Sequence, residues 1–177
     1  KELYSCTIAK SEIDGIIKAA RVLEGTHLVL CGKRSAYIET QDPKALEEFQ
    51  KYYYRCEYVS DLLTVDDEFI KVAICHFDGS EEFVYPTMKA KFDDSHQVVV
   101  SAKIWLDIMN AEASKGAAIK HLQATMGFGP EETMSFGDYL NDLEMLQVSE
   151  HSYAMENAHE AVKLSLIHIS EPTRLTC

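Results

Sequence analysis

The sequence predicts an α/β protein built from two consecutive units, and three observations support this prediction. Helical and strand-like periods alternate along the chain. Roughly the first hundred residues form one α+β pattern without repeats or low-complexity segments. After Asn110 the order becomes helix, strand, loop, helix, strand, helix, which is typical of a parallel sheet with crossover helices. We therefore expect a complete small α+β domain and part of a second, parallel-sheet domain.

The first unit begins with a short strand candidate over 2–8 and an amphipathic helix over 11–25. Ser11 is the expected cap of this helix, with Asp14 three residues further on, and Gly25 is expected to close it. One helical face carries apolar side chains, which predicts its buried side: Ile13, Ile16, Ile17, Ala20 and Leu23.

Two strands, over 26–32 and 35–40, are expected next, joined by a tight turn at 32–34. A second helix is predicted over 42–58, with Asp42 as its cap and Pro43 at its first position. Its inward side chains are predicted to be Leu46, Phe49, Tyr53 and Cys56.

The first unit is completed by a buried strand over 69–77, a helical segment over 80–92 disturbed by Pro86, and a strand or strand pair over 96–109. We expect the strands to form one sheet whose helices cover one face. No recognisable catalytic cluster lies in this unit.

Two motifs in the first unit resemble functional ones but have simpler interpretations. The run 32–35 ("GKRS") resembles the end of a phosphate-binding loop, yet Gly25 is too far back and Arg34 replaces the hydroxyl residue, so we expect a hairpin turn. The three tyrosines at 52–54 could stack on bases, but they lie on the predicted helix without a basic stripe. We expect them to pack in the core and at its rim.

The second unit is predicted to start with a helix over 114–127, capped by Ser114 and ended by Gly127. A buried strand over 132–136, a polar loop, a helix over 142–146, a strand over 151–155 and a helix over 156–164 follow. Residues 164–177 show no regular period, and we expect a non-native tail, with a genuine extended tail as the alternative.

Charge and composition restrict the classes of partner. A net charge of −12 and a pI near 4.9 argue against nucleic acid or an anionic membrane as partner, because both repel an acidic surface. No apolar run approaches the roughly 20 residues that a bilayer crossing needs, and no signal peptide is visible. The start at Lys1 leaves open that the native N-terminus is missing.

The cysteines and histidines do not form recognisable metal motifs. The five cysteines are widely spaced and never form a Cys-x-x-Cys pair, so we expect reduced thiols, mostly buried, in a cytoplasmic protein. The seven histidines show no His-x-x-x-His spacing.

The polar loop of the second unit is a candidate metal site. Asp138 follows the predicted strand directly after Gly137, and Asn141 and Asp142 lie on the first turn of the next helix. Ligands of parallel α/β sheets bind beyond the carboxyl ends of strands, and carboxylate and amide oxygens suit Mg²⁺. Alone, the pattern fits equally a turn followed by a helix cap.

Lys115 favours the interpretation as a site. A cation at the start of a helix opposes the helix dipole, unless an anion binds there to both the helix end and the ammonium group. A phosphate beside Mg²⁺ would explain it, and a solvated surface lysine is the alternative.

The segment from Ser114 to Lys163, with lysine-glycine, "GDYLND" and "AMENA" in that order, closely resembles haloacid-dehalogenase-superfamily phosphatases of the Cof type. The resemblance implies a Rossmann-like core with an inserted α+β cap that sets substrate choice. It implies the end of a core segment at 1–6, the cap at 7–109, the C-terminal part of the core at 110–163 and the tail at 164–177.

The resemblance also implies roles for individual residues. Lys115 and Asp142 would be catalytic, with Asp138 and Asp142 at the Mg²⁺ site. Lys115, Asn141 and Asn157 would bind the phosphoryl group or support the loop around it, and for Asn157 a helix cap is the alternative. The implied substrate is a small phosphorylated metabolite.

The sequence departs from the family pattern in one respect. Members begin with Asp-x-Asp-Gly-Thr, whose first aspartate is the nucleophile, and neither this motif nor the following Ser/Thr segment is present; the run 77–80 ("FDGS") lies in the cap region and is no substitute. We expect a fragment of a Mg²⁺-dependent hydrolase that works through an aspartyl-phosphate and has negligible turnover alone. The alternatives are a nucleophile-free pseudoenzyme or binding protein and, less in keeping with the strand order, a response-regulator-like acidic pocket.

Overall fold

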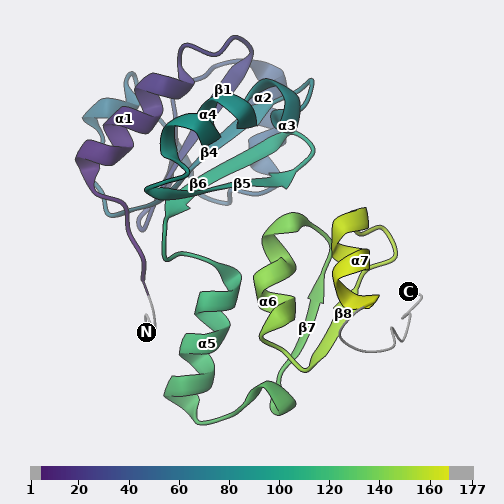
Figure 1. The fold of residues 1–177 in the computed structure, drawn as a ribbon. Coiled ribbons are helices and arrows are strands. Elements are labelled where there is room, and N and C mark those ends of the chain that lie inside the picture. Colours follow the sequence, from purple (N-terminus) through teal and green to yellow (C-terminus); the bar gives the residue numbers. More distant parts are fainter. Residues whose placement is uncertain (1–4, 168–177) are drawn as a thin grey trace. The chain divides into compact units, whose positions relative to one another are not determined.

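The computed structural model describes residues 5–167. In this range the chain forms two compact units, 5–111 and 112–167. Figure 1 colours the first unit from purple to teal and the second from green to yellow. The mixed α/β architecture that the sequence predicts is confirmed.

A six-stranded sheet forms the centre of the first unit, in the order β3-β2-β1-β4-β6-β5. β2 and β3 run parallel, and the other neighbouring pairs are antiparallel. The predicted turn at 32–34 is confirmed, since the Gly32 N–H donates to the Ser35 carbonyl at 2.9 Å. The strands are β1 (Thr26–Gly32), β2 (Ala36–Ile38), β3 (Cys56–Tyr58), β4 (Phe69–His76), β5 (His96–Ala102) and β6 (Trp105–Asn110).

Helices cover both faces of this sheet, so the prediction of helices on one face is wrong. α2 (Pro43–Gln50) buries Ala45 and Phe49 against one face, in a cluster with Val29, Cys31, Ala73, Cys75 and Trp105. α1 (Lys10–Ala20) and α4 (Tyr85–Phe92) contact each other and the strands. The strand residues that alternate with the cluster are buried too: Leu28, Leu30, Val72, Ile74, Leu106 and Ile108. Because β1 and β4 are apolar on both sides, both faces need cover.

The start of α1 differs from the prediction. The helix begins at Lys10, and the Ala9 N–H donates to Oε2 of Glu12 at 3.1 Å, so Ser11 is not the cap. The predicted strand over 2–8 is also wrong for its described part, where Ile8 forms an isolated bridge with Phe69. The buried face of α1 is as expected, although Leu23 lies beyond the helix end.

The second helix is shorter than predicted. Asp42 and Pro43 act as expected, with the Ala45 N–H donating to Oδ1 of Asp42 at 2.9 Å. α2 ends at Gln50, however, and β3 (Cys56–Tyr58) occupies the end of the predicted range. The helical segment around Pro86 is divided, as expected, into α3 (Ser80–Phe83) and α4.

The second unit combines a two-stranded parallel sheet with three α-helices among its described residues. β7 (Met134–Gly137) and β8 (His151–Ala154) pair in parallel, with Met134 opposite His151. α5 (Lys115–Met126) is capped by Ser114, whose Oγ accepts from the Ala117 N–H at 3.0 Å, and Gly127 ends it in the left-handed region. η3 (Leu140–Asp142) and α6 (Leu143–Gln147) connect the strands, and α7 (Glu160–Ile167) follows.

Two details of the second unit correct the sequence analysis. β7 is buried on one side only, because Met134 and Phe136 remain 57% and 45% exposed. The last helix begins at Glu160 rather than 156 and continues through Ile167, so it includes the first residues of the predicted tail. Residues 168–177 of that predicted tail lie outside the described residues.

Candidate functional site

The end of β7 turns directly into the polar loop. Gly137 makes this turn possible, because its backbone lies very close to the side chains of Asp142 and Leu146. A Cβ atom on Gly137 would lie 2.7 Å from the Cβ of Asp142 and 3.0 Å from Cδ1 of Leu146. Any larger residue would therefore push α6 away from the strand end. Gly137 thus allows Asp142 to lie directly against the end of β7.

Asp142 is the buried centre of this loop. Its Oδ2 accepts hydrogen bonds from the Asp138 N–H at 2.9 Å and the Tyr139 N–H at 3.4 Å. Its Oδ1 accepts from the ammonium group of Lys115, with which it forms an ion pair. Both carboxylate oxygens therefore have partners, and the carboxylate links the loop to the start of α5.

Lys115 reaches Asp142 because α5 and α6 pack closely. A Cβ atom on Gly116 would lie 2.7 Å from the Cβ and 2.8 Å from the backbone carbonyl atoms of Glu144, so only glycine fits this contact without a shift. The Lys115 side chain remains 50% exposed. Its ammonium group can thus contact a ligand in solvent while Asp142 holds it in place.

Opposing effects set the pKa of Asp142. Burial of the carboxyl group raises its pKa, but the hydrogen bond from Lys115 and those from the backbone N–H groups of Asp138 and Tyr139 lower it more. The pKa of Asp142 therefore lies below its usual range. The Asp142 carboxyl group is therefore charged at neutral pH.

Asp138 and Asn141 lie beside this pair, each with a free side chain. Asp138 is exposed, and neither its carboxylate nor the amide of Asn141 hydrogen-bonds to another described residue. Both side chains are therefore available to a ligand at the strand end, on the loop that Asp142 fixes.

Asn157 lies in a loop that is attached to the same strand end at two points. The Met155 N–H donates to the Gly137 carbonyl at 3.0 Å, and the His159 N–H donates to the Asp138 carbonyl at 2.8 Å. The alternative role of Asn157 as a helix cap is not observed, since His159 Nδ1 accepts from the Ala161 N–H at 3.1 Å at the start of α7.

His159 and Tyr139 are positioning residues that sequence reasoning missed. Their rings meet edge to face, with centroids 5.4 Å apart, and so pack the two loops together. The sequence does not predict this contact, because the two loops come together only through the parallel pairing of β7 and β8.

The oxygen donors of this loop suit a magnesium ion only in an open site. No cluster of three or more His, Cys, Asp or Glu side chains suited to a metal occurs between residues 5 and 167. Asp138 offers a free carboxylate, whereas both oxygens of Asp142 are engaged. Mg²⁺ often binds through one or two carboxylates together with substrate phosphates and water. The residues fit an open site, in which Asp138 and a substrate phosphate would share the ion. They do not fit a closed site made of protein ligands alone.

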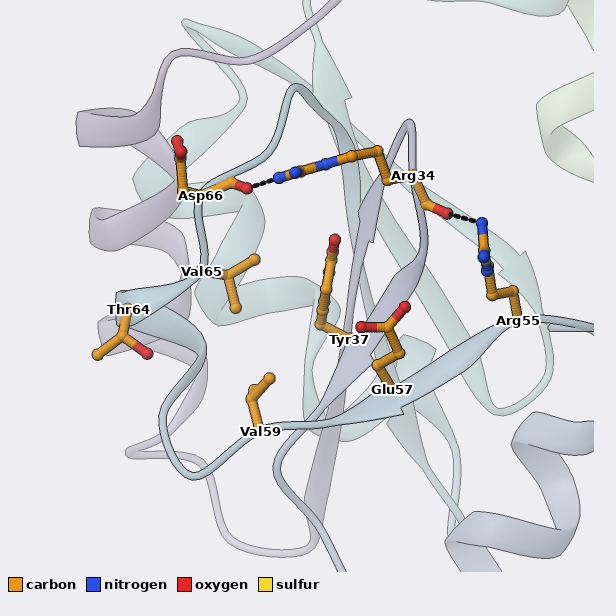
Figure 2. Close-up of a pocket in the computed structure, with 8 residues that line it drawn as sticks. All are labelled: Arg34, Tyr37, Arg55, Glu57, Val59, Thr64, Val65 and Asp66. Atoms are coloured by element: carbon orange, nitrogen blue, oxygen red, sulfur yellow. Dashed lines mark hydrogen bonds between the residues drawn. The ribbon is translucent and has the colours of Figure 1, made fainter.

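Among the described residues, two open cavities of the first unit stand out, and neither includes a predicted site residue. One has a volume of about 470 Å³ and lies between β2, β3 and the segment 64–66. Figure 2 shows Tyr37, Val59 and Val65 along it, with Arg34, Arg55, Glu57 and Asp66 around them. The two arginines and the two carboxylates of this cavity balance in charge.

Over the part of the chain that the structure describes, no helix has the length and apolar character needed to cross a membrane.

Comparison with known proteins identifies the family. A model of the haloacid dehalogenase-like hydrolases matches residues 1–174. The chain belongs to this family. The resemblance to Cof-type phosphatases is thereby confirmed, as is the fold class.

A curated relative and several solved structures resemble the chain over most of its length. The 5-amino-6-(5-phospho-D-ribitylamino)uracil phosphatase YbjI of Escherichia coli is 28% identical over 166 residues, which are 92% of this chain and 60% of YbjI. The structure of SMU.1108c from Streptococcus mutans has a TM-score of 0.81 at 22% identity and covers 90% of this chain and 61% of that one. The sugar phosphatase BT4131 has a TM-score of 0.78 at 20% identity, with 92% and 61% coverage.

The chain thus spans about three fifths of the length of these relatives. The structural likeness shows the shared fold. The match to the family model extends into the segment 164–177, and both the assignment of that segment and the division into cap and core stay predictions.

Proposed function

We propose that this chain supplies the lysine and the magnesium-binding carboxylate of a phosphatase site that hydrolyses small phosphate monoesters. The ion pair between Lys115 and Asp142, next to the free carboxylate of Asp138, carries this proposal. A buried anion that holds a half-exposed ammonium group beside a second, unpaired carboxylate is suited to binding a phosphoryl group together with a metal ion.

Each residue has a distinct task in this proposal. Lys115 binds the phosphoryl oxygens, and Asp142 keeps the ammonium group oriented. Asp138 holds Mg²⁺, which would neutralise charge on the transferring phosphoryl group. The amides of Asn141 and Asn157 project from loops tied to the same strand end, where they can donate to the substrate.

The substrate class follows from charge and from the relatives. YbjI is named for the phosphate ester of a ribitylaminouracil, and BT4131 is named a sugar phosphatase. We infer a small phosphorylated metabolite, a sugar or cofactor phosphate, for the complete site. A net charge of −12 makes nucleic acid and anionic membranes unfavourable partners.

The reaction requires a nucleophile in addition to these residues. Family resemblance implies an aspartate that attacks phosphorus and forms an aspartyl-phosphate, which water then hydrolyses. The sequence contains no Asp-x-Asp-Gly-Thr motif. We therefore expect residues 1–177 to bind phosphate and Mg²⁺ with negligible turnover.

Binding of inorganic phosphate in the presence and absence of MgCl₂, measured by calorimetry, tests this proposal. Mg²⁺ is expected to strengthen phosphate binding, Asp138→Asn to abolish the effect of Mg²⁺, and Lys115→Met to weaken phosphate binding about tenfold. Lys120→Met is the matched control, because Lys120 is an exposed lysine on the same helix.

Two results would contradict the proposal. Equal phosphate binding by the Lys115 and Lys120 variants would remove the role of Lys115. Mg²⁺-dependent phosphatase activity of the unmodified chain that is lost in Asp138→Ala would show that the chain needs no further nucleophile.

A further inference from the structure

The second open cavity of the first unit differs from the first in its charge. We call it the tyrosine groove; it has a volume of about 370 Å³ and is lined by the turn 31–36, the segment 52–55 and the pair Ile70 and Lys71. It lies where α2 has ended, so the segment 52–55 forms one wall and the ends of β1 and β4 the other. This volume suits a small molecule.

The tyrosine groove is cationic although the chain is acidic. Lys33, Arg34, Arg55 and Lys71 line it, and no Asp or Glu is among its described lining residues. Three of these cations have a carboxylate partner behind the lining: Lys33 pairs with Glu68, Arg34 with Asp67 and Lys71 with Asp107. The whole chain carries 29 acidic and 17 basic side chains, so a groove lined by cations and without a lining carboxylate runs against its composition. Arg55 is the lining cation without a described carboxylate partner, and its positive charge attracts anions.

Lys71 keeps its positive charge at neutral pH, and Cys31 stays uncharged. Burial lowers the pKa of Lys71, but Asp107, whose Oδ2 accepts from the ammonium group at 2.9 Å, raises it more, so that it lies above its usual value. Burial raises the pKa of the Cys31 thiol to about 11, so Cys31 adds no negative charge.

Arg55 is the cation best placed to bind a ligand. The other two described arginines form ion pairs, Arg21 with Glu39 and Asp61, and Arg34 with Asp67, whereas no described carboxylate lies within ion-pair distance of Arg55. Its Nη1 donates to the Arg34 carbonyl at 3.2 Å, as Figure 2 shows. The guanidinium group is thus held in position while most of its N–H donors stay unused.

The tyrosines give the groove an aromatic wall. Tyr54 is fully exposed and Tyr52 is 63% exposed, while Tyr53 is largely covered and packs against the core cluster. Tyr52 and Tyr53 meet Trp105 edge to face, with ring centroids 5.9 and 6.3 Å away. Trp105 therefore fixes this wall, and exposed aromatic rings beside a free guanidinium group favour a planar anionic ligand.

We propose that the tyrosine groove binds a small aromatic anion, with its ring against Tyr52 and Tyr54 and its carboxylate or phosphate group on Arg55. This proposed site uses residues of the first unit alone, whereas the phosphatase site proposed above uses residues of the second unit.

Titration of the isotope-labelled full chain with benzoate, followed in amide NMR spectra without Mg²⁺, tests this inference. Saturable shifts are expected at the amides of 31–36 and 52–55. Arg55→Gln should weaken benzoate binding about tenfold, and Tyr54→Ala about fivefold. Lys18→Gln is the control for charge, because Lys18 is an exposed cation on α1, outside the groove. Benzyl alcohol, which lacks the charge, should bind at least about tenfold more weakly than benzoate.

The outcomes separate this site from the phosphatase site. Lys115→Met and Asp138→Asn should leave benzoate binding unchanged, whether or not they affect phosphate binding. Equal affinities of the Arg55 and Lys18 variants, or equal binding of benzyl alcohol and benzoate, would overturn the inference. Tighter binding of a thymidine oligonucleotide through the same amides would overturn it as well, by making the groove a single-strand interface. Since Tyr54 is fully exposed, its variant tests the site even if Arg55→Gln impairs folding.

Discussion

Asp142 shows how one buried carboxylate organises a loop. It serves two backbone N–H groups and one ammonium group. Asp142→Ala leaves these donors without their acceptor, and we expect a loss of about 2–3 kcal/mol in the free energy of unfolding. Asp142→Asn keeps an acceptor for the backbone and should lose about 1 kcal/mol. Urea unfolding measures both values, and equal losses would show that the backbone bonds contribute nothing.

The lowered pKa of Asp142 gives this contribution a pH dependence. A carboxyl group with a lower pKa in the folded state stabilises the protein above its unfolded pKa, near 4, and this stabilisation is lost as the pH falls through the folded pKa. The difference in unfolding free energy between the unmodified chain and Asp142→Asn should therefore be constant from about pH 7 to 5 and shrink below about pH 4. A difference that grows on acidification would contradict the assigned direction.

At the scale of elements, the close packing of α5 on α6 depends on Gly116. Alanine has the higher helix propensity, but its Cβ would come within 2.8 Å of the Glu144 backbone. We expect Gly116→Ala to lower the free energy of unfolding by about 1–3 kcal/mol. The matched control is Gly15→Ala in α1, where no atom lies within 4 Å of the added Cβ; it should stabilise by about 0.5–1 kcal/mol. Thermal unfolding distinguishes the two signs.

Helix caps offer a second test at this scale. Asp42→Ala removes the acceptor of the Ala45 N–H and should cost about 1 kcal/mol, whereas Ser11→Ala should change stability by less than about 0.5 kcal/mol because Ser11 is not the cap of α1. Similar losses of unfolding free energy for the two variants in chemical denaturation would indicate that Ser11 does cap α1, as the sequence predicts.

Elements with a strong local signal could be predicted from the sequence, and those that depend on partners could not. The caps at Asp42 and Ser114 and the loop at Gly137 are local patterns, and they occur where expected. The end of α2 at Gln50 depends on the pairing of Cys56–Tyr58 with β2. This pairing joins residues far apart in the sequence, so the local helical period of 42–58 does not reveal it. Lys115, Asp138, Asn141 and Asp142 were singled out by their place at a strand end or helix start, and the family resemblance then implied their roles. His159 became visible only through its contacts.

At the scale of the whole molecule, the described cysteines all belong to the first unit but lie in different environments. Cys75 is fully buried, and burial raises its pKa to about 12, while Cys6 is partly exposed. Brief treatment of the native chain with iodoacetamide should modify Cys6 well before Cys75 or Cys31, because the thiolate is the reactive form. Mass spectrometry of the peptides measures the order, and early modification of Cys75 would show that the first unit opens readily.

The bonds of Asp142 also bear on how fast a ligand can bind. Its oxygens hold the turn at 138–139 and the start of α5 through bonds within the chain itself. A phosphate that binds at the proposed site would therefore meet a surface that needs little rearrangement, because the entropy cost of ordering these segments is already incurred during folding. Association should be limited by diffusion and its ionic-strength dependence rather than by a slow conformational step. Affinity differences among ligands of this proposed site should then appear mainly as differences in their dissociation rate constants.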